Sequence, residues 1–383
     1  MTNKLENLRS LNKAIIKFGT RVLSRTPEET TVFSPQSLFT ALAMTSLGAI
    51  GETLTEMLDT TSIIDLLEKG PNFWNAFKAQ EKNLQSLLSS DVTFYNVNWL
   101  VLNEKIKLSL RFETCIKDLF NPEIKEADFE KSADQETTKI NNDVARITNN
   151  LITNLIPNGT LTSDTILVLL NAIYFKASWE NKFNTRLTKN QDFNKLNGSV
   201  TSKEMMTVPN IKEAKVEKVK FATIADLPYL NSNLVFRIIF PDDENSYLKT
   251  EVNLLDHLTH NIIRESNLTV TMPKFKIESS LDAATILKQM GMVQAFSDSA
   301  DFSPMLSDDN LKSDIKVGNV IHKATFEVTE EGSEGSAATA VVMIQKCVSK
   351  PEPTVNLTLN RPFFFAIQDP NTKTTLFIGK YLG

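Results

Sequence analysis

Hydrophobic residues along the first 155 positions recur mostly at helical spacing. Between Leu5 and Ser24, apolar side chains return every three or four residues, which predicts an amphipathic helix. Ser34 followed by Pro35 is typical of a helix start, with the serine as N-cap and the proline in the first turn. Helices are predicted over 5–24, 34–47, 51–90 with a break at Gly70-Pro71, 104–120 and 132–155, and strands over 32–33 and 92–102.

From Thr165 onward the pattern changes to short apolar runs. The run from Ile166 to Lys176 is almost continuously apolar, as expected for a strand covered on both faces. Because helices crowd the first part of the chain and strands the remainder, an α+β fold is predicted. No change in composition separates the two parts, so we expect a single domain over 1–383, although length alone suggests roughly two or three domains. Strands are predicted over 166–176, 215–221, 227–229, 234–240, 268–275, 323–328, 355–359, 363–368 and 376–381, and helices over 254–264 and 282–290.

The stretch from Glu330 to Val342 follows neither pattern. It begins with charged residues, continues through very small ones and ends in β-branched ones, which suits a segment that can become a strand inside a sheet. In a strand, alternate side chains point to opposite faces of the sheet, which divides this stretch into an inward and an outward set of residues, here called phases. The phase that starts at Ser333 carries no charge and can face inward, whereas Glu334 falls in the outward phase. The inward phase is Ser333, Gly335, Ala337, Thr339, Val341 and Met343.

Insertion of this stretch into a sheet would be strongly favourable. About ten new ladder hydrogen bonds contribute about 1 kcal/mol each. Burial of Val341 and Met343 adds about 1.5–3 kcal/mol apiece, so the total is about 10 kcal/mol or more. A charge in the inward phase would cost several kcal/mol instead.

Charge and cysteine content narrow the class of protein. The chain has 383 residues, of which 46 are acidic and 41 basic, for a net charge of −5. This mild acidity argues against nucleic acid or an anionic membrane as a main partner. Cys115 and Cys347 have no metal-like spacing, so two free thiols are expected rather than a disulfide.

The N-terminal residues lack the apolar core of a secretory signal, and the longest apolar stretch is too short to cross a bilayer. On this basis we expect a cytoplasmic protein. Leaderless release to the extracellular space stays open as an alternative.

Several motifs in a fixed order resemble those of the serpin family of serine protease inhibitors, and the resemblance covers essentially the whole chain. The segment from Glu330 to Ala340 also resembles the hinge of that family. The other motifs are Phe33-Ser34-Pro35-Gln36-Ser37 with Ala41 to Ala49, Asn171 to Trp179, Met272-Pro273-Lys274-Phe275, Leu287 to Met292 with Phe296-Ser297, and Leu357 to Ile367.

The resemblance implies one domain of about eight or nine helices and three β-sheets, with an exposed reactive-centre loop over about 330–354. It also implies suicide inhibition. A protease cuts the loop and is held as a covalent acyl-enzyme while residues about 333–344 insert as a new strand. The expected state is a monomer that can form loop–sheet polymers, because the apolar run 340–344 is strand-like. The hinge residues implied are Glu330, Glu331, Gly332, Ser333, Glu334, Gly335, Ser336, Ala337, Ala338, Thr339 and Ala340.

Counting seventeen residues from Glu330 in the family's spacing gives Lys346, so the reactive bond is expected at Lys346–Cys347. A lysine before the cut suits trypsin-like enzymes, whose specificity pocket is acidic. Papain-like cysteine proteases also accept basic residues and stay open as an alternative. Because the span from Cys347 to the last motif is longer than usual in the family, Gln345 and Cys347 are rivals for the residue before the cut.

The resemblance further implies a hydrogen-bonded shutter beneath the place where the main sheet opens, and a breach where the loop first enters. A buried histidine with asparagine and serine partners forms a network that two states of a sheet can satisfy differently. The shutter and breach residues implied are Ser34, Pro35, Ser37, Asn171, Trp179 and His322.

Other activities lack the residues that they need. His257 and His260 lie three apart without a third metal ligand, so neither a metal nor a cofactor is expected. No Gly-x-Ser-x-Gly elbow and no Gly-rich phosphate loop occurs, so we do not expect an enzyme. Lys78 and Lys82 alone do not make a heparin site. The alternative to an inhibitor is a serpin-fold protein that binds or carries a ligand.

Overall fold

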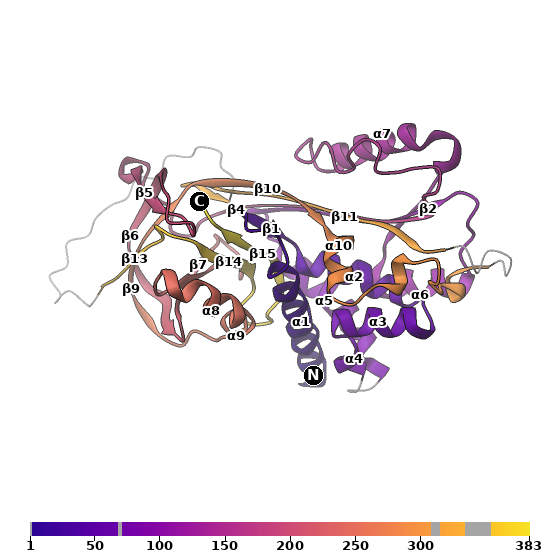
Figure 1. The fold of residues 1–383 in the computed structure, drawn as a ribbon. Helices are drawn as coiled ribbons and strands as arrows, with labels where there is room; N and C mark the ends of the chain where they lie inside the picture. The colour runs from indigo at the N-terminus through magenta and orange to yellow at the C-terminus, as the bar shows by residue number, and fades with distance from the viewer. Residues whose placement is uncertain (1, 68–70, 308–314, 334–353) are drawn as a thin grey trace.

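The computed structural model describes residues 2–67, 71–307, 315–333 and 354–383. A long sheet runs through the molecule in Figure 1, with most of the N-terminal helices beneath it and α7 on the opposite face. A second, strongly curved set of strands lies at the other end of the molecule, with α8 and α9 against it. This arrangement is the α+β architecture that the sequence predicts.

Ten α-helices occur in the described part of the chain, against about eight or nine expected. Three of them are short: α4 has four residues, and α8 and α9 have six each. The helices are α1 (Thr2–Leu23), α2 (Pro35–Ser46), α3 (Gly51–Thr61), α4 (Ile64–Leu67), α5 (Asn75–Leu87), α6 (Leu110–Phe120), α7 (Phe129–Ile147), α8 (Tyr247–Val252), α9 (Leu254–Thr259) and α10 (Ala283–Gln289).

The long sheet positions the candidate site. Its strand order is β10-β11-β4-β2-β3, and the two-residue strand β12 also pairs with β4. β11 and β4 are parallel and pair directly from Val317↔Leu167 to Thr325↔Tyr174. All but two residues of β4 are buried, as its apolar sequence predicts. The strands are β2 (Val92–Asn103), β3 (Glu123–Ala127), β4 (Leu167–Ser178), β10 (Phe275–Asp282), β11 (Val317–Val328) and β12 (Gly332–Ser333).

The remaining strands form a nine-stranded network that divides at β6. The first part of β6 pairs with β5 and β9, whereas its last residues, Val216–Val219, pair with β7. One long strand therefore joins two sheets, which together with the long sheet give the three expected. The strands are β1 (Thr31–Phe33), β5 (Lys189–Asn194), β6 (Val200–Val219), β7 (Ala222–Pro228), β8 (Val235–Pro241), β9 (Glu265–Pro273), β13 (Thr354–Thr358), β14 (Phe363–Gln368) and β15 (Thr375–Tyr381).

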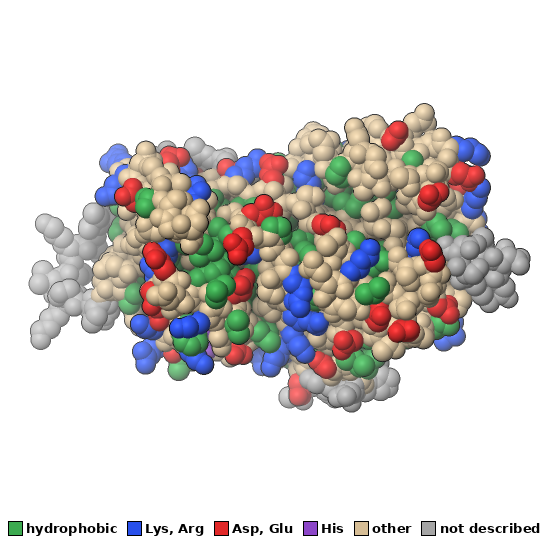
Figure 2. All heavy atoms as spheres, viewed as in Figure 1, with side chains coloured by type: hydrophobic (Ala, Val, Ile, Leu, Met, Phe, Trp, Pro, Cys, Tyr) green, Lys and Arg blue, Asp and Glu red, His purple; other side chains and the backbone are tan. Residues whose placement is uncertain are grey.

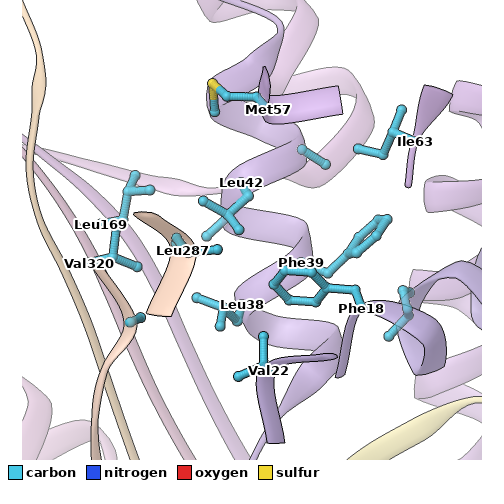
Figure 3. Close-up of a cluster of buried hydrophobic side chains, with 14 of the residues drawn as sticks. Phe18, Val22, Leu38, Phe39, Leu42, Met57, Ile63, Leu169, Leu287 and Val320 are labelled. Atoms are coloured by element: carbon cyan, nitrogen blue, oxygen red, sulfur yellow. The ribbon is translucent and has the colours of Figure 1, made fainter. Parts of the chain in front are cut away.

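The largest buried cluster fills the space between the long sheet and the N-terminal helices. In Figure 3, Leu169 and Val320 point from the sheet toward Leu38 and Leu42 of α2, while Phe18 of α1 packs on the far side of α2. Helix α2 is buried along nearly its whole length, so it supports the sheet from inside the molecule.

Two helix predictions extend too far. The helix predicted over 132–155 ends at Ile147, because Asn149 and Asn150 adopt positive φ angles of 50° and 62°. Asparagine is one of the few residues that enter this left-handed region readily, and it ends helices there. The helix predicted over 254–264 likewise ends at Thr259.

The segment 104–109 is not helical, because α6 begins only at Leu110 with Ser109 as its N-cap. The strands β3, β5 and β10 have no counterpart in the sequence prediction. β3 and β5 are short and mostly polar, and they lie at sheet edges where no apolar alternation is required.

Candidate functional site

Four of the predicted shutter residues meet beneath the pairing of β11 with β4. His322 on β11 lies opposite Asn171 on β4. The Ser34 backbone N–H donates to His322 Nε2 over 3.1 Å, and Asn171 Nδ2 donates to Ser37 Oγ. The fold therefore brings these residues, which are far apart in the sequence, into one hydrogen-bonded cluster, here called the shutter cluster (Ser34, Ser37, Asn171 and His322).

Local sequence explains how α2 presents the two serines. Ser34 is the N-cap, because its Oγ accepts a hydrogen bond of 3.2 Å from the Ser37 backbone N–H. Pro35 occupies the first helical position, where its missing N–H needs no partner. This start fixes α2 so that the Ser34 N–H points at His322.

Two asparagines of β2 join the shutter cluster and were not predicted. Ser37 Oγ lies 3.0 Å from Asn96 Oδ1 and 2.7 Å from Asn98 Oδ1, and Asn171 Nδ2 also donates to Asn98. Their signal was present in the sequence. Val92, Phe94, Leu100 and Leu102 share one face of the strand predicted over 92–102. Asn96 and Asn98 interrupt this apolar face, which is unusual for a face that covers a core.

His322 is neutral in this setting. Its side chain is completely buried, and this burial lowers the pKa to about 3. Because Nε2 accepts the Ser34 N–H, the ring hydrogen is on Nδ1, which has no partner among the described residues. Asn171 Oδ1 also lacks a partner there. While β11 pairs with β4, the His322 Nδ1–H donor and the Asn171 Oδ1 acceptor thus have no partner among the described residues, and both could form hydrogen bonds in another arrangement of the strands.

The asparagines also border a hollow. Asn96 and Asn98 line a cavity of about 430 Å³ between β2 and the helix α5, which contributes Glu81 and Leu84 to its wall. Packing against this part of β2 is therefore incomplete.

Trp179, the predicted breach residue, lies at the end of β4 and is 1% exposed. Its Nε1 donates to the Thr329 carbonyl oxygen over 2.9 Å. Its ring stacks on Tyr229 with centroids 4.8 Å apart and planes inclined by 9°. The tryptophan thus packs as a core residue and at the same time holds the end of β11.

Both glutamates of the described hinge are held by lysines. Glu330 Oε2 lies 3.2 Å from Lys274 Nζ, and its Oε1 accepts from the Thr188 hydroxyl over 2.8 Å. Burial raises the pKa of Glu330, but the Thr188 hydrogen bond and Lys274 outweigh it, and the net shift is downward. Glu331 pairs with Lys182 over 2.6 Å. Sequence reasoning named the glutamates and missed their partners.

Gly332 and Ser333 form β12 and pair with the end of β4, as Gly332↔Ser178 and Ser333↔Ala177. Ser333 is completely buried, and the neighbouring Gly332 is buried as well. Its Oγ lies 2.7 Å from Tyr229 Oη, so Tyr229 is a further residue of the site that sequence reasoning missed.

The rest of the predicted hinge, Glu334 to Ala340, lies outside the described residues, as do Lys346 and Cys347. Within the described ranges, no group of three or more His, Cys, Asp or Glu side chains is arranged to hold a metal ion. His257 lies on α9 and His260 follows its last residue. None of the described helices is both long and apolar enough to cross a bilayer.

Comparison with known proteins gives the family. A family scan matches residues 10–383 to "Serpin (serine protease inhibitor)". The chain belongs to the serpin family. Human Serpin B4 is 31% identical over 394 residues, which cover 98% of this chain and 99% of that protein.

Solved serpin structures have the same fold. The native state of Tengpin, a thermophilic serpin, superposes with a TM-score of 0.82 at 27% identity, covering 97% of this chain and 93% of that one. Human thyroxine-binding globulin superposes with a TM-score of 0.79 at 24% identity, over 98% and 99% of the two chains. The fold alone therefore does not separate a protease inhibitor from a carrier.

In this serpin the long sheet is closed between β11 and β4. The two strands pair at consecutive positions from Asn319 to Thr325, and β12 pairs farther along β4, at Ala177 and Ser178 near Trp179. At this end of β4, Ala177 and Ser178 therefore pair with the hinge and not with β11.

Proposed function

We propose that this serpin inhibits a trypsin-like serine protease as a suicide substrate cleaved at Lys346–Cys347. The observation that carries the proposal is the state of the hinge. The chain after β11 already turns back and pairs with β4, and Ser333 is buried at the first position of the predicted inward phase. The inward positions that follow are small or apolar and uncharged.

The proposed reaction begins as ordinary proteolysis. The protease serine Oγ attacks the Lys346 carbonyl carbon, the bond to Cys347 breaks, and the released amine of Cys347 takes a proton. Lys346 is then held as an ester on the protease. Two processes compete from this point: water hydrolyses the ester, or the freed loop inserts between β11 and β4 and carries the protease along before hydrolysis.

Specificity is assigned to Lys346. A lysine side chain fits a pocket with an acidic residue at its base, which favours trypsin-like targets. Cleavage after Gln345 or Cys347 would indicate a different target class. A papain-like cysteine protease would give a thioester in place of the ester.

Incubation with trypsin, followed by denaturing gel electrophoresis and mass spectrometry, tests the proposal. We expect a complex that survives denaturation, with the cut after Lys346. Lys346→Ala should abolish the complex with trypsin, whereas the matched change Lys350→Ala should preserve it. Clean cleavage without a complex would contradict the proposal and favour a serpin that only binds or carries a ligand.

A further inference from the structure

The hinge of the uncut protein is a formed structure. Thr329 donates from its backbone N–H to the Gly332 carbonyl oxygen over 2.8 Å, and its hydroxyl donates to the same oxygen over 3.0 Å. These bonds close a tight reversal between β11 and β12. The turn between them is tied down by the Phe183 N–H to the Glu330 carbonyl and the Trp179 N–H to the Glu331 carbonyl, each over 3.0 Å.

β12 lies in the fork between β11 and β4. Ala177 pairs with Val92 of β2 on one edge and with Ser333 on the other. The direct pairing of β11 with β4 stops at Tyr174, three residues earlier in β4. Ser333 therefore occupies the first position of the path that an inserting strand would follow.

One side chain satisfies the Ser333 hydroxyl. Tyr229 Oη lies 2.7 Å from Ser333 Oγ, and both groups are buried. Burial raises the pKa of Tyr229, so its hydroxyl keeps its proton and either group can donate. A buried tyrosine hydroxyl normally requires such a partner.

Tyr229 is itself rigidly placed. Its ring stacks on Trp179, and the next residue, Leu230, donates from its N–H to the Ser178 carbonyl oxygen over 2.8 Å. The tyrosine is thus fixed to the end of β4, against which Ser333 pairs. The Tyr229 hydroxyl therefore keeps its position relative to β4 and does not move with the hinge.

We propose that Tyr229 is a positioning residue that holds Ser333 as the first rung of the insertion strand before the loop is cut. Insertion then extends an existing pairing and does not have to start a new one. Starting a new strand costs conformational entropy before its hydrogen bonds form and compensate for that cost. A residue that is already paired therefore speeds insertion relative to hydrolysis of the acyl-enzyme. This inference rests on the proposed inhibitory function.

The test compares Tyr229→Phe, Ser333→Ala and the double variant in titrations against trypsin. Loss of one hydrogen bond should slow insertion about two- to tenfold. The excess of the inhibition stoichiometry above one should rise by the same factor, while the acylation rate stays at the wild-type value. Because both hydroxyls act through one contact, the double variant should be no worse than either single variant.

Tyr247→Phe is the matched control. Tyr247 is also buried and stacks at 4.8 Å, on Phe364, but lies on α8. It should leave the stoichiometry unchanged. If Tyr229→Phe behaves like this control, or only lowers thermal stability with the stoichiometry unchanged, the positioning role is overturned.

Hydrogen exchange of the uncut protein separates this inference from the proposed function. Peptides covering 329–333 should be protected in the wild type and exchange faster in Tyr229→Phe and Ser333→Ala. Equal exchange rates in the wild type and both variants would overturn the proposal that Tyr229 holds Ser333, even if the wild type traps trypsin. A wild type that traps no protease would refute the inhibitory function, and the exchange result would still decide whether Tyr229 holds Ser333.

Discussion

His322 and Asn171 face each other across the two strands that would have to separate, and each keeps one polar atom without a partner in the described structure. An unsatisfied buried polar atom costs about 1–3 kcal/mol. The pairing of β11 with β4 therefore carries a free-energy cost at the place where the sheet would open, and the neighbouring asparagines of β2 offer other hydrogen-bond partners. A network of this kind can favour two states of the sheet by similar amounts.

The buried histidine predicts a pH dependence. The pKa of His322 in the folded state is about 3, below its ordinary value of 6.5. The unfolded chain, or an open sheet that hydrates the ring, binds a proton below pH 6.5 that the closed sheet does not. The stability of the closed sheet is therefore complete above pH 6.5 and falls by about 1.4 kcal/mol for each pH unit below it, until pH approaches 3.

Melting curves of the uncut protein between pH 7 and 5 measure how steeply its stability falls with pH. This window avoids Glu330, whose pKa is lowered and whose contribution is lost only below its ordinary value of 4.5. His322→Gln should flatten the slope. His257→Gln should keep most of it, although burial lowers the pKa of His257 as well. Parallel slopes for wild type and His322→Gln would refute this prediction.

At the residue scale, the sequence predicted the shutter cluster but not the residues that complete it. The resemblance supplied all four residues: Ser34, Ser37 and Asn171 lie within its motifs, and His322 directly precedes the strand predicted over 323–328. Asn96 interrupts an apolar strand face without indicating its partner, Tyr229 lies in an ordinary strand sequence, and the partners of both are distant in the chain. Only the register of β2 on β4 and the return of β12 to β4 determine those contacts.

The hinge is the element on which the proposed insertion depends, and its backbone approaches β4 most closely at Gly332. A Cβ atom at Gly332 would lie 2.7 Å from Ser178 Cα and closer still to the Ala177 carbonyl oxygen. Gly332→Ala must push β12 away from β4. We expect a loss of about 1–3 kcal/mol of stability, as for other overpacked sites, and faster hydrogen exchange at the hinge.

Gly318→Ala provides the control, because a Cβ atom there would meet the Leu167 carbonyl oxygen of β4 at 3.3 Å. Denaturation midpoints should change much less for this variant. Equal midpoints for the two alanine variants would show that the close approach at Gly332 is relieved without displacing β12.

The inward phase of the hinge predicts a second pair of variants. Thr339→Arg puts a charge on the buried side of the inserting strand, at a cost of several kcal/mol. Trypsin should then cleave the protein without being trapped. Ala340→Arg puts the same charge in the outward phase and should keep trapping. Retention of trapping by Thr339→Arg would show that the assigned phase is wrong.

At the element scale, long periodic or apolar segments were predicted well and their ends less well. β4 and α1 follow directly from their hydrophobic patterns. The helix predicted over 132–155 is too long because Asn149 and Asn150 were not recognised as a left-handed stop. β3 and β5 were missed because polar edge strands carry no alternating pattern.

For the whole molecule, the sequence indicated an α+β serpin fold, and the structure adds how its sheets connect. The long strand β6 joins two sheets through changes of register that no local pattern marks. Charged residues of both signs are interspersed on the face shown in Figure 2, in keeping with the small net charge. The central property is energetic: the closed sheet pairs β11 with β4, whereas insertion of the loop would add a strand.

Thermal unfolding before and after a single cut in the loop tests that property most directly. A strand that contributes about 10 kcal/mol should raise the midpoint by about 12 °C in a protein of 383 residues. Far-UV circular dichroism of purified uncut and cut protein at the same pH gives both midpoints. We predict a large upward shift after cutting, and a cut form that melts at or below the uncut midpoint would contradict the account.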